Sequence, residues 1–508
     1  MDISNQILEE KKLLYPYQIN DVDKIFQILH EKQHNYHLLY QLPTGGGKTV
    51  IFSEITRRFI AEFNENVLVL THRIELCKQT SKMLKHFNVK NKIINSEIKI
   101  ADEEKEINCY VAMVETLSNR LNDDKFKIKN IGLVIIDEAH FNSFTKIFKY
   151  YENCFFLGVT ATPLSSNIKE PMYKNYNTLI TGSSIHELIQ NNYLSRPNYT
   201  HYNIGLGMLK VGANGDYTVK SSDELYASED MLNKTLKAYY ETSLNKKTLI
   251  FNNGIKTSLE VYETLKKANL PVKHLDHSFT SEERKDILKW FKHTPNAIIS
   301  SVSILTTGFD EPTIESIILN RATRSIALYF QMIGRGSRLL PNKNNFQITD
   351  LGNNIVRFGF WHDPVDWHYI FKYPEYFIQN IKNDKEIEEQ FSYEMTQETK
   401  SFFPNTTNFE FNIVKEYQQA LKKFLKTKTV IDKSVDQHVD IIFENADNFQ
   451  TARKLIEILK DEIEFRVRQY THQLGNTTFN YRNWLIEDYH LKLRQKLNAK
   501  YRELALKE

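Results

Sequence analysis

A glycine-rich stretch near the start of the chain constrains its fold more than any other feature. The sequence LPTGGGKTV occupies residues 42–50, directly after the apolar run HLLYQL and directly before the helical run IFSEITRRFIAEF. Glycines let the backbone turn so that its N–H groups point at phosphate oxygens, and the N-terminus of the following helix adds a favourable dipole. The full P-loop pattern has Gly at the position of Leu42, so a glycine-rich turn that binds nothing is the alternative interpretation.

The loop predicts a set of contacts to a nucleoside triphosphate such as ATP. Lys48 would reach the β- and γ-phosphates, and the hydroxyl of Thr49 would hold magnesium. Four further loop residues would surround the phosphates, namely Thr44, Gly45, Gly46 and Gly47.

A pair of acids later in the chain favours phosphate chemistry. Asp137 and Glu138 end the apolar run IGLVIIDEAH, which would deliver both carboxylates to the edge of a sheet where open α/β folds bind ligands. Asp137 would hold magnesium, and Glu138 would orient and activate the attacking water. A solvated acidic turn is the alternative, but the order of P-loop first and acidic strand end later argues against it.

Apolar runs that alternate with helical stretches form two blocks. The first holds HLLYQL, NVLVL, CYVAMV, LVIID and FFLGVTA, and the second holds TLIFNN, VKHLD, AIISS, SIILN and FQITD. Continuous apolar runs are typical of parallel strands that are buried on both faces. We therefore expect an α/β fold with two tandem doubly wound parallel-sheet lobes and a mainly helical C-terminal domain. The predicted ranges are 1–203 for the first lobe, 204–245 for a polar linker or small hairpin, 246–368 for the second lobe and 369–508 for the helical domain.

Charge and cysteine content argue against several classes of protein. The net charge of +3 over 508 residues is no basic excess, although a near-neutral body can still carry a local basic channel. Cys77, Cys109 and Cys154 lie far apart without a CxxC pair, so neither a zinc ribbon nor a structural disulfide is expected. The N-terminal charges argue against a signal peptide, and we find no long apolar run that would span a membrane. These features predict a cytoplasmic protein with no membrane partner.

The order of short motifs carries a family resemblance. After Gln18 in LLYPYQ come the P-loop, THRIEL from Thr71, VETLSNR from Val114, DEAH and GVTATP from Gly158. The second block adds LIFNN, SILTTGFDEP and QMIGRGSR. In this order the chain resembles superfamily 2 helicases of the DEAH type, which have two RecA-like lobes that hydrolyse ATP, with magnesium, in the cleft between them. The resemblance implies that Gln18 contacts the adenine base, although Tyr15 stands where the family usually has Arg.

Two arginines in the last of these motifs are implied to act on the nucleotide from the second lobe. Arg335 and Arg338 are one helical turn apart and can share a face. The resemblance implies that Arg338 stabilises the charge of the transferring phosphoryl group, that Arg335 contacts the γ-phosphate, and that Gln331 lines the cleft. Surface ion pairs are the alternative for both arginines. Gly308 and Asp310, in SILTTGFDEP, are also assigned to the nucleotide site.

Polar residues at strand-end loops are candidates for contacts to a nucleic-acid backbone. Hydroxyl, amide and guanidinium groups bind phosphates without choosing a base. Each residue by itself is more often a cap or a turn residue, so the assignment depends on the surrounding motif. The candidates are Thr71, His72, Arg73 and Thr116 in the first lobe, and Asn252 or Asn253, Thr306 and Thr307 in the second.

Three stretches of sequence, one near the lobe junction and two in the second lobe, make the family resemblance more specific. NNYLSRPNY, LTTGFD and GRGSRLLPNK are most similar to the RadD group and its XPB-like relatives, which are linked to repair and remodelling of duplex DNA. RadD proteins carry a cysteine-rich, zinc-binding C-terminal part that this chain does not have. The expected function is an ATP-dependent DNA helicase or translocase, with DNA favoured over RNA and a role in repair or recombination. The alternatives are an RNA helicase, and a nucleotide-gated clamp or motor subunit of a defence or restriction complex.

The C-terminal segment admits two interpretations. Basic and aromatic residues interleave in FRVRQYTHQ and YRNWLIEDYHLKLRQK, which is typical of a module that binds nucleic acid or a protein partner. Acids interrupt the basic residues, however, and four leucines suggest the apolar face of a plain helical domain, namely Leu485, Leu491, Leu493 and Leu497. We favour the plain helical domain for most of these residues. In RFGFWHDPVDWHYIF, a packed aromatic junction is favoured over a metal site.

Overall fold

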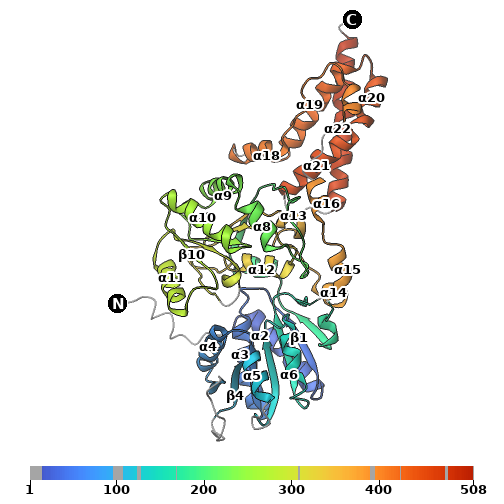
Figure 1. Cartoon of the computed structure of the whole chain (residues 1–508). Helices are drawn as coiled ribbons and strands as arrows, with labels where there is room; N and C mark the ends of the chain where they lie inside the picture. Colours follow the sequence, from blue (N-terminus) through green and yellow to red (C-terminus); the bar gives the residue numbers. More distant parts are fainter. Residues whose placement is uncertain are drawn as a thin grey trace. The chain divides into compact units, whose positions relative to one another are not determined.

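The computed structural model divides the chain into two compact units (Figure 1). The first holds Met1–Ile204 and Met208–Ile381, and the second holds Gly205–Gly207 and Lys382–Glu508. The structure describes residues 14–94, 107–122, 128–167, 169–306, 309–389, 395–423, 425–474 and 479–506. Two of the predicted site residues, Thr307 and Gly308, lie outside the described residues.

The first lobe is built on a sheet of seven parallel strands in the order β3-β4-β2-β5-β6-β1-β7. The strands are β1 His37–Gln41, β2 Asn66–Thr71, β3 Asn91–Ile94, β4 Cys109–Met113, β5 Ile131–Asp137, β6 Phe155–Thr160 and β7 Thr178–Thr181. The helices and 3-10 turns around them are α2 Pro16–Glu31, α3 Lys48–Phe63, α4 Ile74–His86, α5 Val114–Leu121, η1 Asn142–Phe144, α6 Thr145–Phe148 and η2 Met172–Lys174. Helix α7 Ile185–Gln190 follows β7, but its buried Ile185 and Leu188 pack in the core of the second lobe.

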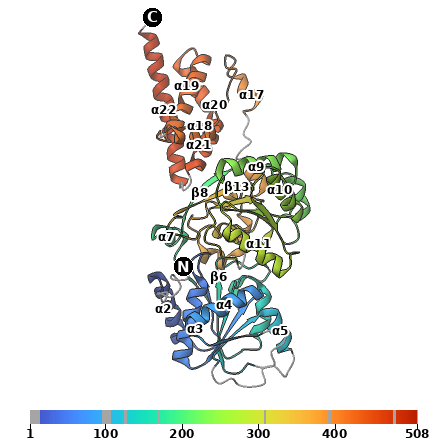
Figure 2. The ribbon, with the colours of Figure 1, turned by 90° about the vertical axis from the view of Figure 1, so that its left-hand side faces the viewer.

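The central strand β5 shows why the buried strands are continuously apolar. Leu133 and Ile135 belong to the core on one face of the sheet, whereas Val134 and Ile136 belong to the core on the other face. Because successive side chains of a strand point to opposite faces, a sheet covered on both sides needs an apolar residue at every position. Helices α3 and α4 lie side by side over one face (Figure 2).

The second lobe is a six-stranded parallel sheet in the order β10-β11-β9-β12-β13-β8. Its strands are β8 Arg196–His201, β9 Thr248–Asn252, β10 Val272–Leu275, β11 Ile298–Ser301, β12 Ser316–Asn320 and β13 Asn345–Asp350. Its helices and 3-10 turn are α8 Val219–Tyr226, α9 Glu229–Thr242, α10 Ile255–Lys267, α11 Ser281–His293, η3 Ser303–Leu305, α12 Ile326–Gly334 and α13 Asn354–Phe358, followed by α14 Trp367–Lys372 and α15 Pro374–Gln379. The predicted fold class, two tandem RecA-like doubly wound lobes, is confirmed for this unit.

Strand β8 lies within residues 1–203, the range predicted for the first lobe, yet it forms the edge of the second sheet. Its sequence RPNYTH has no apolar run, and no residue of the strand is fully buried. An edge strand that is half open to solvent does not need the apolar pattern that marks the central strands.

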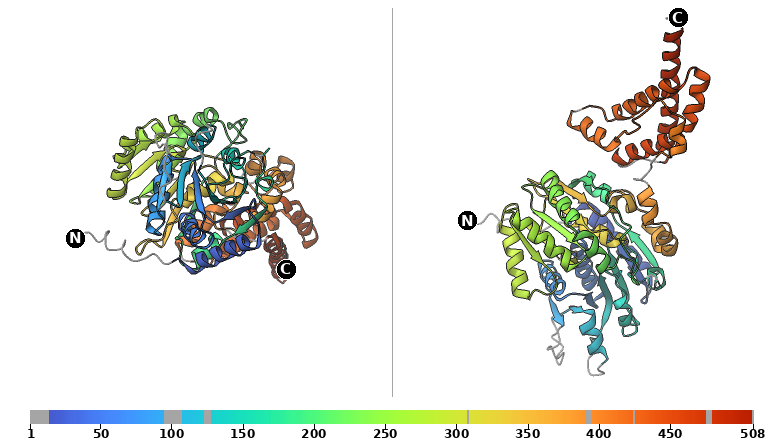
Figure 3. Two further views of the ribbon diagram at one scale, coloured as in Figure 1. Left: turned by 90° about the horizontal axis from the view of Figure 1, so that it is seen from below. Right: turned by 45° about the horizontal axis from the view of Figure 1, so that its top comes forward.

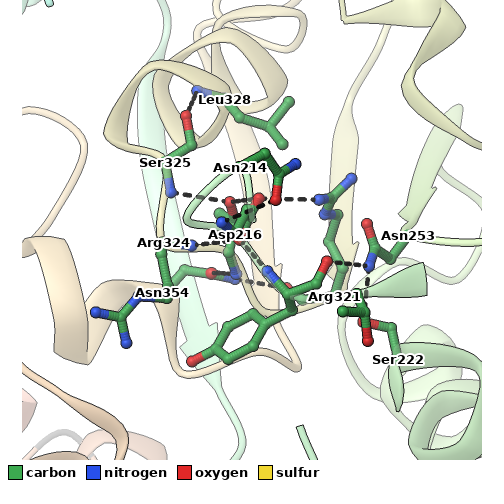
Figure 4. Close-up of polar contacts among 12 residues, drawn as sticks. Asn214, Asp216, Ser222, Asn253, Arg321, Arg324, Ser325, Leu328 and Asn354 are labelled. Atoms are coloured by element: carbon green, nitrogen blue, oxygen red, sulfur yellow. Dashed lines mark hydrogen bonds and ion pairs between the residues drawn. The ribbon is translucent and has the colours of Figure 1, made fainter. Parts of the chain in front are cut away.

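The polar segment that follows β8, within the range 204–245 predicted as a linker or small hairpin, is part of the second lobe and is anchored there by Asp216. Its carboxylate accepts hydrogen bonds from the Thr323 hydroxyl at 2.7 Å and from the Arg324 backbone N–H at 2.8 Å, and it lies 3.5 Å from the Arg321 guanidinium. Arg321 is buried, with 4% of its surface exposed. Figure 4 shows this carboxylate among the residues that follow β12. The segment predicted to be a linker therefore provides the counterion of a buried arginine.

We expect Asp216→Ala to lower the free energy of unfolding of the first unit by about 2–4 kcal/mol, because it leaves a buried guanidinium without its carboxylate. Denaturant unfolding measures the change. Asp230→Asn, at an exposed acid of the same segment, is the matched control and should change stability by less than about 0.5 kcal/mol. Equal stability of the two variants would contradict the anchoring role.

The second unit is helical, and its orange-to-red helices pack against one another (Figure 3). The helices are α16 Asp384–Glu389, α17 Gln397–Ser401, α18 Ile413–Lys422, α19 Thr429–Asn445, α20 Phe449–Ile458, α21 Lys460–Leu474 and α22 Phe479–Ala505. The predicted helical character is confirmed, but one leucine of the predicted apolar face is misplaced. Leu491 is 55% exposed, and the buried stripe of α22 runs along every fourth residue, namely Leu485, Tyr489, Leu493 and Leu497. No helix among the described residues is long and apolar enough to cross a membrane.

The segment RFGFWHDPVDWHYIF forms the aromatic junction that was favoured for it. Trp361 is fully buried, and Trp367 packs edge-on against Phe330 with 5.6 Å between the ring centroids. Within the described part of the chain, no cluster of three or more His, Cys, Asp or Glu residues could hold a metal ion. All three cysteines are buried and free.

Candidate nucleotide site between the two lobes

The glycine-rich loop has the backbone geometry that its sequence predicts. It connects β1 to α3, which begins at Lys48. Gly45 and Gly47 have φ values of +97° and +86°, in the region that favours glycine. A Cβ atom on Gly47 would lie 2.5 Å from Nε2 of Gln18, so a side chain there would displace the Gln18 amide as well as strain the left-handed backbone.

Two residues at the start of α2 form hydrogen bonds with the glycine-rich loop. The Tyr17 hydroxyl donates a hydrogen bond to the Gly46 carbonyl at 2.7 Å, and the Gln18 amide donates to the same carbonyl at 3.2 Å. The Tyr17 ring also packs against Tyr193, with 4.9 Å between the centroids. Tyr193 was not among the predicted site residues, although it lies in the family-like stretch NNYLSRPNY.

The acidic strand end places two carboxylates next to each other. Glu138 follows β5 and has a φ of +53°, which is uncommon for a residue with a side chain and is a strained conformation often found at functional sites. Its backbone N–H donates to Oδ1 of Asp137 at 3.0 Å. Burial raises the pKa of Asp137 and the charge of Glu138 raises it further, against the opposing charge of Lys48. Although burial acts to raise the pKa of Glu138, the charges of Lys48, His140 and Arg335 hold it below its usual value.

Lys48 lies half-buried beside these acids. Its ammonium donates a hydrogen bond to the Leu42 carbonyl at 3.3 Å. Burial lowers the pKa of Lys48, and Glu138 and Asp137 oppose this shift. These residues fit a magnesium-bound triphosphate, because a divalent cation would stabilise the ionised form of Asp137 and phosphate oxygens would neutralise Lys48.

His140 links the acids to the second lobe. Its Nδ1 lies 3.0 Å from the Thr160 hydroxyl and 3.5 Å from Oε2 of Glu138. Its Nε2 lies 3.4 Å from the side-chain amide of Gln331, on α12 of the second lobe. The Thr160 hydroxyl donates in turn to the Thr162 carbonyl at 3.1 Å. Neither threonine of the GVTATP motif was among the predicted site residues, although their spacing around Ala161 was a signal that could have found them.

The two arginines after α12 differ in their contacts. Arg338 donates from Nη1 to the Gly45 carbonyl at 2.7 Å and from Nε to Oδ1 of Asp310 at 2.9 Å. Arg335 donates to the carbonyls of Thr306 and Phe309, and burial lowers its pKa to about 10. Arg338 therefore contacts the P-loop across the cleft, whereas Arg335 holds the loop around Asp310.

Gly334, at the end of α12, lies against Thr44 of the P-loop. A Cβ atom on Gly334 would lie 2.6 Å from Cβ of Thr44. We expect Gly334→Ala to hold the lobes apart and to lower kcat for ATP hydrolysis about tenfold or more, since displacements below 1 Å cost rate at a catalytic site. Steady-state ATPase measures the effect. Gly205→Ala, where a Cβ meets no atom within 4 Å, is the matched glycine control. A normal rate for Gly334→Ala would show that this close approach is not needed.

Several residues expected to contact nucleic acid have partners inside the protein. The Thr71 hydroxyl is buried, where it donates to the Arg73 carbonyl and lies 3.0 Å from Sγ of Cys77. The Asn252 amide is also buried, and it donates to Ser300 and Ser301. Thr71 thus supports the loop that follows its strand, whereas Asn252 ties β9 to the neighbouring strand β11.

The other residues that were expected to contact nucleic acid lie nearer to the boundary between the two lobes. Arg73 donates to the Ile304 carbonyl of the second lobe at 3.2 Å. His72 packs against Phe141 at 4.6 Å, and burial lowers its pKa to about 4. The remaining candidates are placed as follows: Thr116 is half-buried on α5, Asn253 donates to Tyr217 and Ser222, and Thr306 is buried.

Comparisons with known proteins match two parts of this chain to family models. Residues 11–165 match the family model "Type III restriction enzyme, res subunit", and residues 230–339 match "Helicase conserved C-terminal domain". "Putative ATP-dependent helicase IRC3" of Saccharomyces cerevisiae is 27% identical over 66% of this chain and 51% of its own length. The "51.5 kDa protein" of a Lactococcus phage is 26% identical over 62% of this chain and 66% of its own length. The chain thus spans about half to two thirds of the length of these relatives.

A solved structure supports the fold. A fragment of an HsdR subunit of a type I restriction enzyme from Vibrio vulnificus superposes with a TM-score of 0.54 at 22% identity, over 67% of this chain and 65% of that one. Together these matches indicate a DEAD/DEAH-like helicase of superfamily 2 that is similar to the type I and type III restriction subunits. The family resemblance predicted from the motifs is confirmed.

Proposed function

We propose that the chain is a DNA translocase or helicase that couples ATP hydrolysis between its two lobes to movement along, or remodelling of, DNA. The observation that carries this proposal is the hydrogen bond from Arg338 of the second lobe to the Gly45 carbonyl of the P-loop. A guanidinium that already reaches the phosphate-binding loop can transfer its hydrogen bonds to a triphosphate without a large movement.

Each residue of the site has one role in this proposal. Thr49 and Asp137 hold magnesium, Lys48 neutralises the β- and γ-phosphates, and Glu138 orients and deprotonates the attacking water. The low pKa of Glu138 keeps its carboxylate ionised and able to accept a proton. The bound magnesium triphosphate supplies the phosphoryl group that is transferred to water. Arg338 and Arg335 stabilise the charge that develops on that group.

Contacts between the two lobes couple ATP hydrolysis to movement. Gln331 lies on α12 and contacts His140, next to Glu138. Arg73 and Ile304, in segments proposed to follow the nucleic-acid backbone, are bonded to each other across the lobes. When the cleft opens or closes, the distance between the two segments changes, and nucleic acid that both segments hold is displaced.

DNA is favoured over RNA by the restriction-enzyme likeness, because restriction enzymes act on DNA. The same likeness favours a second candidate function, the motor subunit of a restriction or defence complex, over a stand-alone role in repair.

Displacement of a labelled third strand from a DNA triplex tests translocation directly. The proposal predicts ATP-dependent displacement that Lys48→Ala abolishes. ATP hydrolysis stimulated by DNA without displacement would favour a nucleotide-gated clamp instead.

A further inference from the structure

A buried lysine of the second lobe lies behind the arginine that reaches the P-loop. Lys343 has 6% of its surface exposed. Its Nζ donates hydrogen bonds to three backbone carbonyls, those of Pro312, Gly336 and Arg338, at 3.0, 2.8 and 2.8 Å. A buried ammonium is costly unless its N–H groups are satisfied, and the three carbonyls satisfy all three of them. The lysine therefore links three positions of the backbone at one point.

The three carbonyls belong to the two segments that carry the ion pair between Arg338 and Asp310. Pro312 comes two residues after Asp310, whose carboxylate accepts a hydrogen bond from Nε of Arg338 at 2.9 Å. Gly336 and Arg338 belong to the turn that follows α12. The other side of the same guanidinium donates to the P-loop. Lys343 thus holds the backbone on both sides of this ion pair.

Ser195 supports the same carbonyl from a different segment, just before β8. Its side chain is fully buried, and its hydroxyl lies 2.7 Å from the carbonyl oxygen of Arg338 and 3.1 Å from that of Lys343. Its backbone N–H donates to the Ser337 carbonyl at 2.8 Å. A tight turn brings Lys343 back towards Arg338, because the backbone N–H groups of Leu340 and Lys343 each donate to the carbonyl of the other. Two side chains from separate segments therefore hold the backbone of Arg338.

We propose that Lys343 is a positioning residue for ATP hydrolysis, which holds the backbone of Arg338 so that its guanidinium reaches the P-loop, and that Ser195 assists it. A fixed backbone limits the places that the guanidinium can occupy, and a displacement of about 1 Å can lower a rate about a hundredfold. The role of Lys343 rests on the function proposed for Arg338, because the lysine acts on the nucleotide only through that residue.

Steady-state ATPase of the full chain with Lys343→Met tests this role, because methionine keeps the length of the side chain and removes the ammonium. We expect kcat to fall about tenfold to a hundredfold, with the KM for ATP within about threefold of the wild-type value. Ser195→Ala should lower kcat in the same way by about threefold to tenfold, and it tests the proposal if Lys343→Met does not fold.

Lys247→Met is the matched control. Lys247 is also a buried lysine of the second lobe, with 7% of its surface exposed, and its ammonium donates to the Lys292 carbonyl at 2.8 Å. This variant should lose stability as Lys343→Met does and keep a normal kcat at a temperature where both are folded. A wild-type kcat in Lys343→Met, or in Ser195→Ala where Lys343→Met is not folded, would overturn the proposal.

A double-mutant cycle with Arg338→Ala separates positioning from a general loss of structure. If Lys343 acts through Arg338, then Lys343→Met should change single-turnover hydrolysis by less than about twofold in the Arg338→Ala background. An equal fall in both backgrounds would overturn the positioning role. A defective Arg338→Ala with a normal Lys343→Met would contradict the role of Lys343 alone, whereas a normal Arg338→Ala would contradict the function proposed for the arginine and the role of Lys343 with it.

Discussion

Glu138→Gln is expected to bind ATP and to fail to hydrolyse it. The substitution keeps the size of the side chain but removes the carboxylate that would accept a proton from water. Loss of a positioned general base lowers kcat by about a hundredfold to ten-thousandfold. Steady-state ATPase measures the loss, and binding of a fluorescent ATP analogue shows that the site is intact.

Two comparisons make this result specific. Glu31→Gln, at an exposed position on α2, should hydrolyse ATP at the wild-type rate. Circular dichroism should show that Glu138→Gln is folded, because the left-handed backbone at residue 138 is a property of the strand end and does not require a carboxylate. Turnover of Glu138→Gln near the wild-type rate would show that another group activates the water.

Arg338→Ala is expected to keep ATP binding within a few-fold of normal and to lose hydrolysis by about a thousandfold or more. The residue approaches the P-loop from the second lobe, so its loss removes a contact to the developing charge without altering the first lobe. Arg338→Lys should not restore the rate, because an ammonium cannot reproduce the two-pronged geometry of a guanidinium.

Arg196→Ala, an exposed arginine on the edge strand β8, is the control and should have a normal rate. If Arg338→Ala loses ATP binding instead of turnover, this arginine stabilises bound ATP and not the transition state. Arg335→Ala should differ from both variants. It also frees the carbonyls of Thr306 and Phe309, so it should lower stability as well as activity.

The pattern of neighbouring residues in the sequence was enough to predict the central strands and the P-loop. The run IGLVIID is apolar because β5 is covered on both faces. Gly45 and Gly47 are needed where the loop turns left-handed, and Gly47 also approaches Gln18. These requirements act on neighbouring residues, so they leave a mark in the sequence.

Contacts between residues that are far apart in the chain could not be predicted from the local sequence pattern. The pairing of β8 with β13, the counterion role of Asp216 and the contact of His140 with Gln331 each join segments far apart in the chain. Thr71 and Asn252 stand at strand ends inside helicase motifs, but only the fold shows that their polar groups are satisfied internally. A polar residue at a strand end can support a loop or contact a ligand, and the sequence does not separate the two.

The central claim is that the cleft between the lobes hydrolyses ATP in response to DNA. The most direct test is the steady-state ATPase rate of the full chain at one salt concentration, alone and with single-stranded DNA, duplex DNA and single-stranded RNA. We expect a low basal rate that DNA raises about tenfold or more and RNA does not, with Arg338→Ala unresponsive to either. Stimulation by RNA alone would contradict the assignment of DNA as the substrate, and a rate that no nucleic acid changes would contradict the coupling itself.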